Sequence, residues 1–155
     1  MSYDIGIGEA IFSEKMDDET LKRDIEIEVK KIFLDHAPVW ADDNDPFPDM
    51  SGKSNYRYAG YSSMVDFCKE TGLYEFFFNP EDGLIRHNNY PGSTRIFPKD
   101  LKTITQAKQN WIKNHPNHVP GWKDYQDPTL AKLIWYEFWF EWALKNCRNP
   151  IINAT

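Results

Sequence analysis

Three short stretches of the chain place arginine, tyrosine and histidine side chains where they could bind an anion. Tyr56 and Arg57 lie within NYRYAGYSS, Arg86 and His87 follow a proline- and glycine-containing turn, and Arg95 lies within PGSTRIF. A guanidinium group donates a fork of hydrogen bonds to carboxylate or phosphate oxygens, and phenols and imidazoles can add further donors. These five residues form our candidate ligand-binding site, a pocket for an anionic small molecule.

A cluster of carboxylates indicates a second kind of site. Asp42, Asp43, Asp45 and Asp49 crowd into the segment 36–55, which contains three prolines and a glycine. Calcium favours acidic loops, but the glycine and glutamate positions of the EF-hand order are missing here. We therefore interpret the four aspartates as a surface that binds a basic protein partner.

Two pairs of residues have spacings that metal sites use, but their surroundings argue against a metal. His115 and His118 lie in NHPNHVP, where the prolines prevent a helix, and no HExxH motif occurs. Glu137 and Glu141 stack on one helical face without the Glu-x-x-His pattern of bundle metal sites, and Lys145 stands four residues beyond Glu141. We predict surface or backbone-capping histidines, exposed glutamates, no metal and no cofactor.

The chain carries no catalytic motif of high specificity. Gly6-Ile7-Gly8 is a fragment of the dinucleotide fingerprint, the segment 60–64 fails the nucleophile elbow, and no phosphate-binding P-loop is present. Cys68 and Cys147 are 79 positions apart and belong to no CxxC motif. We expect two reduced thiols in a cytoplasmic protein.

Composition limits the class of protein. With 155 residues, 41% hydrophobic and 15% aromatic, the chain can bury a core, so we expect one folded domain covering residues 1–155. The net charge is −6: residues 1–50 hold 14 acidic and 5 basic side chains, and the remainder hold 10 and 13. Nucleic-acid binding is disfavoured by this balance. No signal peptide and no membrane-spanning run of apolar residues is apparent.

The first elements that could position these residues are strands. Tyr3, Ile5 and Ile7 alternate with small or polar residues, which predicts a strand, and a second alternation predicts another over 25–34. The irregular segment 36–55 predicts a long loop, which is a common place for functional residues.

The middle of the chain predicts a short helix, a hairpin and a longer helix. Ser62 or Ser63 could cap the short helix, which would end near Thr71 with Gly72 as a left-handed cap. The runs LYEFFF and LIRHNN on either side of the turn at 79–83 predict a hairpin. Pro98 favours the start of a helix over 98–114.

The last predicted helix is the richest in information about the fold. Asp127 can cap it with Pro128 at its first position, and it contains LAKLIWYEFWFEWALKNC, with three tryptophans, two phenylalanines and a tyrosine. Glu137, Glu141 and Lys145 fall within an arc of about 80°, so apolar side chains cover most of the cylinder. We predict a largely buried helix, part of whose aromatic surface could contact a partner or a second copy of the chain.

These observations predict an α+β fold. A mostly antiparallel sheet, built from the N-terminal strands and the central hairpin, would pack against one short and two long helices. Function does not follow from the sequence. Our preferred hypothesis is a small, acidic, soluble, non-catalytic protein-binding module, such as an inhibitor, an immunity-type protein or a phage or mobile-element accessory protein. The alternative is a small enzyme or ligand-binding protein that uses the arginine-containing pocket.

Overall fold

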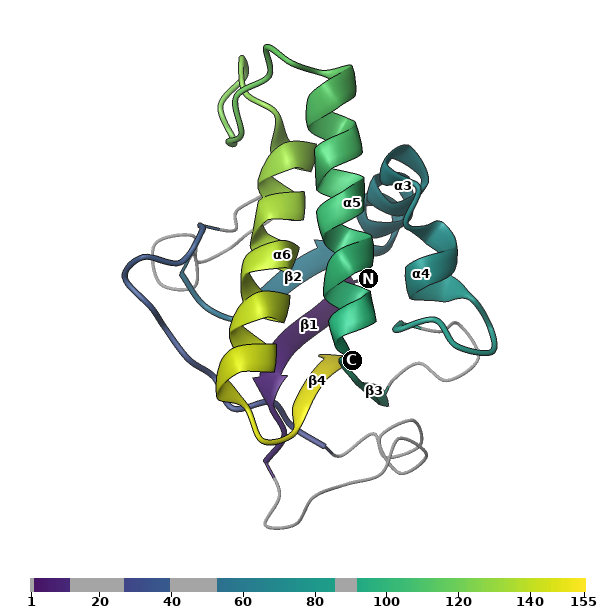
Figure 1. The fold of residues 1–155 in the computed structure, drawn as a ribbon, viewed down its shortest axis with the longest axis vertical. Helices are drawn as coiled ribbons and strands as arrows, with labels where there is room; N and C mark the ends of the chain where they lie inside the picture. The colour runs from purple at the N-terminus through teal and green to yellow at the C-terminus, as the bar shows by residue number, and fades with distance from the viewer. Residues whose placement is uncertain (1, 12–26, 40–52, 86–91) are drawn as a thin grey trace.

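The computed structural model describes residues 2–11, 27–39, 53–85 and 92–155. Four antiparallel strands form one sheet, and two long helices lie side by side across one of its faces (Figure 1). Two shorter helices stand beside the long pair. This arrangement confirms the predicted α+β class, including the antiparallel sheet and the buried aromatic C-terminal helix.

The sheet is assembled from strands that are distant in the sequence. Its order is β2-β1-β4-β3, where β1 is Ser2–Glu9, β2 is Tyr56–Gly60, β3 is Gly92–Arg95 and β4 is Pro150–Ala154. The two ends of the chain therefore pair at the centre of the sheet, and β2 and β3 form its edges.

Strand β1 confirms the alternation predicted from the sequence. Tyr3, Ile5 and Ile7 are buried and join the main core beneath the helices. Gly6 and Gly8 point to the other face, where neighbours come close. A Cβ atom on Gly6 would lie 2.9 Å from the ring of Tyr56, so a larger residue would displace that ring. The two glycines thus allow the segment around Val29 to pass close to this face of the sheet.

The prediction of a second strand over 25–34 is wrong for residues 27–34, the part that the structure describes. These residues form no strand, and they pair with other segments only through two single bridges, Ala10 with Val29 and Phe33 with Ser54. The alternating apolar residues have a different role: Ile27 and Val29 pack with Ala10 and Ile151 in a second, smaller cluster. The apolar residues alternate here because they pack against the face of the sheet that the helices leave uncovered, not because the segment is a strand of the sheet.

The buried side chain of Asn55 helps to hold this crossing segment in place. The side chain of Asn55 accepts a hydrogen bond from the Ile32 amide at 2.8 Å. It also donates to the carbonyl oxygens of Ile7 and Lys30, each at 2.9 Å. These bonds add to the backbone hydrogen bonds of the segment, such as the one that the Lys30 amide donates to the Glu9 carbonyl at 2.8 Å.

Helix α3, Tyr61–Thr71, confirms the predicted short helix and its end. Gly72 adopts φ 75° as the left-handed cap. The predicted serine cap is wrong, because Gly60 occupies the N-cap position and no side chain caps the helix there. The helix therefore begins directly where β2 ends.

The prediction of a central hairpin is wrong for its first strand, the run LYEFFF. Residues Tyr74–Phe78 form a short helix, α4, in which the adjacent Phe77 and Phe78 are both buried. A run of consecutive aromatic residues has no period of two, so propensity and burial decide its conformation. The predicted turn is present, and the amide of Ile85 returns to donate to the Phe77 carbonyl. The remainder of the predicted second strand lies outside the described residues.

The two long helices agree with their predicted bounds. Helix α5 is Pro98–Asn114 and helix α6 is Pro128–Asn146. Trp135 and Trp139 of α6 are fully buried, and Trp135 donates its indole N–H to the Ser54 carbonyl. Among the described residues, no helix is long and apolar enough to cross a membrane.

Candidate functional site

The structure does not bring together the described members of the predicted anion pocket. Arg57 is paired with Ile5 on β1, on the face that meets the helices, whereas Arg95 is paired with Ile151 at the opposite edge and faces the other way. Tyr56 precedes Arg57 in β2 and points away from it. Its hydroxyl donates to the Val29 carbonyl at 2.5 Å.

The other sequence-predicted site residues are not placed. Arg86 and His87 lie outside the described residues, as do Asp42, Asp43, Asp45 and Asp49. The anion pocket and the acidic partner surface therefore remain predictions.

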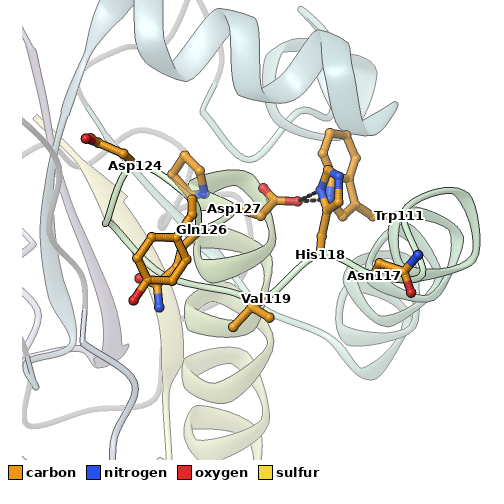
Figure 2. A pocket seen from close by; sticks show the side chains of 9 residues that line it. Trp111, Asn117, His118, Val119, Asp124, Gln126 and Asp127 are labelled. Carbon is orange, nitrogen blue, oxygen red and sulfur yellow. Dashed lines mark hydrogen bonds and ion pairs between the residues drawn. The ribbon is translucent and has the colours of Figure 1, made fainter.

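A different site is built at the connection between α5 and α6, which we call the α5–α6 connection, residues 115–127 (Figure 1). Its central group is the carboxylate of Asp127, the N-cap of α6, which accepts a hydrogen bond from the Leu130 amide at 3.0 Å. The same carboxylate accepts from the indole N–H of Trp111 at 2.7 Å and contacts Nδ1 of His118 at 2.8 Å. Figure 2 shows both contacts converging on one oxygen.

These contacts determine the charge of Asp127. Burial by itself raises the pKa of this carboxyl group, but the hydrogen bonds from Trp111, His118 and the Leu130 amide outweigh burial. The pKa of Asp127 is therefore lowered, and the group is a carboxylate at neutral pH. A negative charge at this position also interacts favourably with the N-terminus of α6.

Three rings lie in contact with one another beside this carboxylate. The ring centroids of Trp111 and His115 are 4.1 Å apart, and those of His115 and His118 are 4.7 Å apart. His115 also contacts the Trp111 carbonyl through Nδ1 at 3.0 Å, as expected of a histidine at a helix end. The described residues contain no group of three or more histidine, cysteine, aspartate or glutamate side chains that could hold a metal ion.

The connection is closed into a compact loop by its own backbone. The Asp127 amide donates to the Val119 carbonyl at 2.7 Å, and the Gly121 amide donates to the Asp127 carbonyl. Gln126 folds over Gly121 so closely that a Cβ atom there would lie 2.1 Å from its side-chain oxygen. These contacts give the loop a defined surface.

Two hollows are lined by residues of the loop. The first, of about 310 Å³, is lined by residues that include Trp111, His118, Val119, Asp124 and Tyr125 (Figure 2). It combines aromatic rings with one exposed carboxylate, that of Asp124. It is therefore suited to a side chain that has both apolar and polar parts.

The second hollow is apolar. It measures about 250 Å³ and lies between the loop, the start of α6 and the described segment that ends at residue 39. Pro38, Val39, Pro120, Trp122 and Ile134 are among its lining residues. No charged side chain is among the described residues that line it.

Exposed apolar side chains line these hollows. Tyr125, which is 78% exposed, and Val119, which is 54% exposed, line the first hollow, and Val39, which is 45% exposed, lines the second. These are three of the eight large hydrophobic residues that are exposed in the described part of the chain. Exposed apolar residues beside a hollow are typical of a binding site.

The His118–Asp127 contact is the main chemical feature of this site. A carboxylate that holds Nδ1 of a histidine can orient the imidazole for proton transfer. The described residues that line the first hollow include no serine, threonine, cysteine, lysine or arginine. The contact also joins the loop to the N-cap of α6.

The sequence contained part of this site. Asp127 was predictable as a cap, but its contacts with Trp111 and His118 depend on the path of the loop, which spacing does not determine. Comparison with known proteins adds no assignment: no family model, curated protein or solved structure matches the chain.

Proposed function

We propose that the chain is a non-catalytic protein-binding module and that it binds its partner through the α5–α6 connection. The observation that carries this proposal is the gathering of Val39, Val119 and Tyr125 around two hollows on a loop that is fixed by its own hydrogen bonds. Exposed apolar residues on a preorganised loop lose little conformational entropy when a partner covers them.

The residue types support a protein as the ligand. Tyrosine and tryptophan dominate the energetics of protein interfaces. Tyr125 lines the first hollow, and Trp122 lines the second. An apolar side chain of the partner would fill the second hollow, and a side chain with a basic end would enter the first beside Asp124. The net charge of −6 favours a basic partner, because opposite charges accelerate association.

Capture of partners from a lysate of the source cells, compared between variants, tests the proposal. The double variant Val119→Ser and Tyr125→Ser removes the two most exposed apolar side chains of the loop. Phe33→Ser is the matched control, because Phe33 is 55% exposed but lines neither hollow. Proteins retained by the wild type and by Phe33→Ser should be lost with the double variant.

Two outcomes would contradict this assignment. If the double variant retains every protein that the wild type retains, the α5–α6 connection is not the binding surface. If the folded wild type retains no protein beyond those retained by the capture support alone, the protein-binding function itself is refuted.

A further inference from the structure

The lining of the first hollow at the α5–α6 connection carries a charge that the second hollow lacks. Asp124 and Asp127 both line it, whereas no lysine or arginine is among its described lining residues. Lys123, the cation next to Asp124 in the chain, is exposed and is not among them. The first hollow is therefore negative at neutral pH, which matches a cationic ligand.

The two carboxylates differ in what they already bind. Asp127 is buried, and its carboxylate contacts Trp111 and His118. Asp124 is exposed and takes part in none of the hydrogen bonds or ion pairs among the described residues. A ligand can therefore pair with Asp124 without breaking a contact that holds the loop.

Rings form much of the remaining surface of this hollow. Trp111, His118 and Tyr125 line it, and Val119 and Pro128 add apolar surface. A cation beside an aromatic face is attracted by the ring, and the attraction grows when the cation is shielded from water. The hollow thus offers aromatic surface and a free carboxylate to the same ligand.

The first hollow has room for one long side chain. Its volume is about 310 Å³, at the small end of the range for small-molecule pockets. Figure 2 shows Asp124 on one side and Trp111 and His118 on the other, with Asp127 between them. A ligand that contacts both sides needs an apolar stem and a charged end, a form that arginine and lysine side chains share.

The hydrogen-bond acceptors of the lining favour arginine over lysine. The carboxylate of Asp124 and the amide oxygen of Asn117 stand at different points of the hollow. A guanidinium group has five donors in a plane, stacks on aromatic rings and is more weakly hydrated than an ammonium group. It can therefore pair with a carboxylate and lie against a ring at a lower cost of desolvation.

We infer that the first hollow is a binding site for an arginine side chain, which a protein partner inserts between the rings and Asp124. The site rests on the protein-binding function proposed above, and it specifies the chemistry of the residue that the partner supplies. The second hollow has no charged side chain among its described lining residues, so the arginine is directed to the first.

Titration of the isolated, ¹⁵N-labelled protein with three small compounds tests this site by NMR. The compounds are the Nα-acetyl amides of arginine, lysine and citrulline, of which citrulline has the shape of arginine without its charge. The arginine compound should shift the amide signals within residues 117–127 and the indole signal of Trp111 in a saturable way. Its half-saturation concentration should be at least about tenfold lower than that of the citrulline compound, because charged hydrogen bonds and cation–ring contacts are lost with the charge. The lysine compound should lie between the two.

Asp124→Asn keeps the shape of the side chain and removes its charge. The half-saturation concentration of the arginine compound should rise about two- to fivefold, the range expected when an exposed ion pair is lost, and that of the citrulline compound should not change. Asp82→Asn is the matched control, because Asp82 is an exposed carboxylate that lines neither hollow; its titration should equal that of the wild type.

The site is overturned if the arginine compound causes no saturable shift at the lining residues, or if it binds no more tightly than the citrulline or the lysine compound. An unchanged arginine titration in Asp124→Asn has the same consequence. If that variant does not fold, the comparison of arginine with citrulline on the wild type decides.

The titration and the capture experiment fail separately. Captured proteins without arginine binding would refute the arginine site and leave the protein-binding function standing. Arginine binding without any captured protein would refute that function and leave the chemistry of the hollow standing.

Discussion

Asp127 is the residue that ties the α5–α6 connection to the helices on both sides, since Trp111, His118 and the Leu130 amide share its carboxylate. Asp127→Ala should lower the free energy of unfolding by about 1–2 kcal/mol at neutral pH, because it removes an N-cap and the acceptor of the Trp111 indole. Chemical denaturation measures the loss. Asp124→Ala, which removes an exposed carboxylate three residues earlier, should change stability little.

The same residue makes a pH-dependent prediction. The pKa of Asp127 is lowered in the folded state from its ordinary value of 3.8. The stability that the Asp127 carboxylate contributes is therefore fully present above the ordinary pKa, and it is lost as the pH falls through the lower pKa of the folded state. The stability difference between the wild type and Asp127→Ala should shrink as the pH falls below 3.8 into strong acid. A difference that does not shrink there would contradict the lowered pKa.

Gly83 shows how one position controls the turn that follows α4. A Cβ atom there would lie 2.5 Å from the backbone nitrogen of Asn79 and 2.7 Å from the Phe77 carbonyl oxygen. Backbone atoms cannot move aside as side-chain ends can, so Gly83→Ala should destabilise the fold by about 1–3 kcal/mol in urea unfolding. Gly60→Ala, where the nearest atom is 3.9 Å away, should cost less; equal losses would contradict this account.

At the scale of elements, α6 is the centre of the core. Phe140 is fully buried in the main cluster, whereas the next residue, Glu141, forms an exposed pair with Lys145 at 2.7 Å. Phe140→Ala should lower the free energy of unfolding by about 3–5 kcal/mol through lost burial and the cavity left behind. Glu141→Ala should cost less than about 1 kcal/mol. Comparable losses for the two neighbours would show that α6 is not buried as described.

The ends of helices were predicted well where a single nearby residue determines them. Pro98 and Pro128 mark the starts of α5 and α6, and Gly72 marks the end of α3, because proline and left-handed glycine act within one turn of the backbone. Elements were missed where distant partners decide. Strand β4 has only five residues and becomes a strand because β1 and β3 pair with it. The segment near Val29 has alternating apolar residues, yet it is held by Asn55 and by a few backbone hydrogen bonds rather than by a continuous ladder.

For the whole molecule, the sequence predicted the fold class better than the site. Burial patterns were sufficient for the two layers, since each layer needs an apolar face. The sites, in contrast, depend on which residues that are distant in the sequence come close together in the fold. Arg57 and Arg95, which looked equivalent in the sequence, lie on opposite edges and faces of the sheet, because strand order is not visible in spacing. Conversely, Trp111 and Asp127 meet because α5 and α6 pack against each other.

The central claim, that the α5–α6 connection binds a protein partner, is tested most directly by site-specific photo-crosslinking. A photoreactive phenylalanine analogue replaces Tyr125 in one protein and Phe33 in another, and both are expressed and irradiated in the source cells. We predict a discrete crosslinked product from position 125 that is absent from position 33. No product from position 125, or the same products from both positions, would contradict the claim.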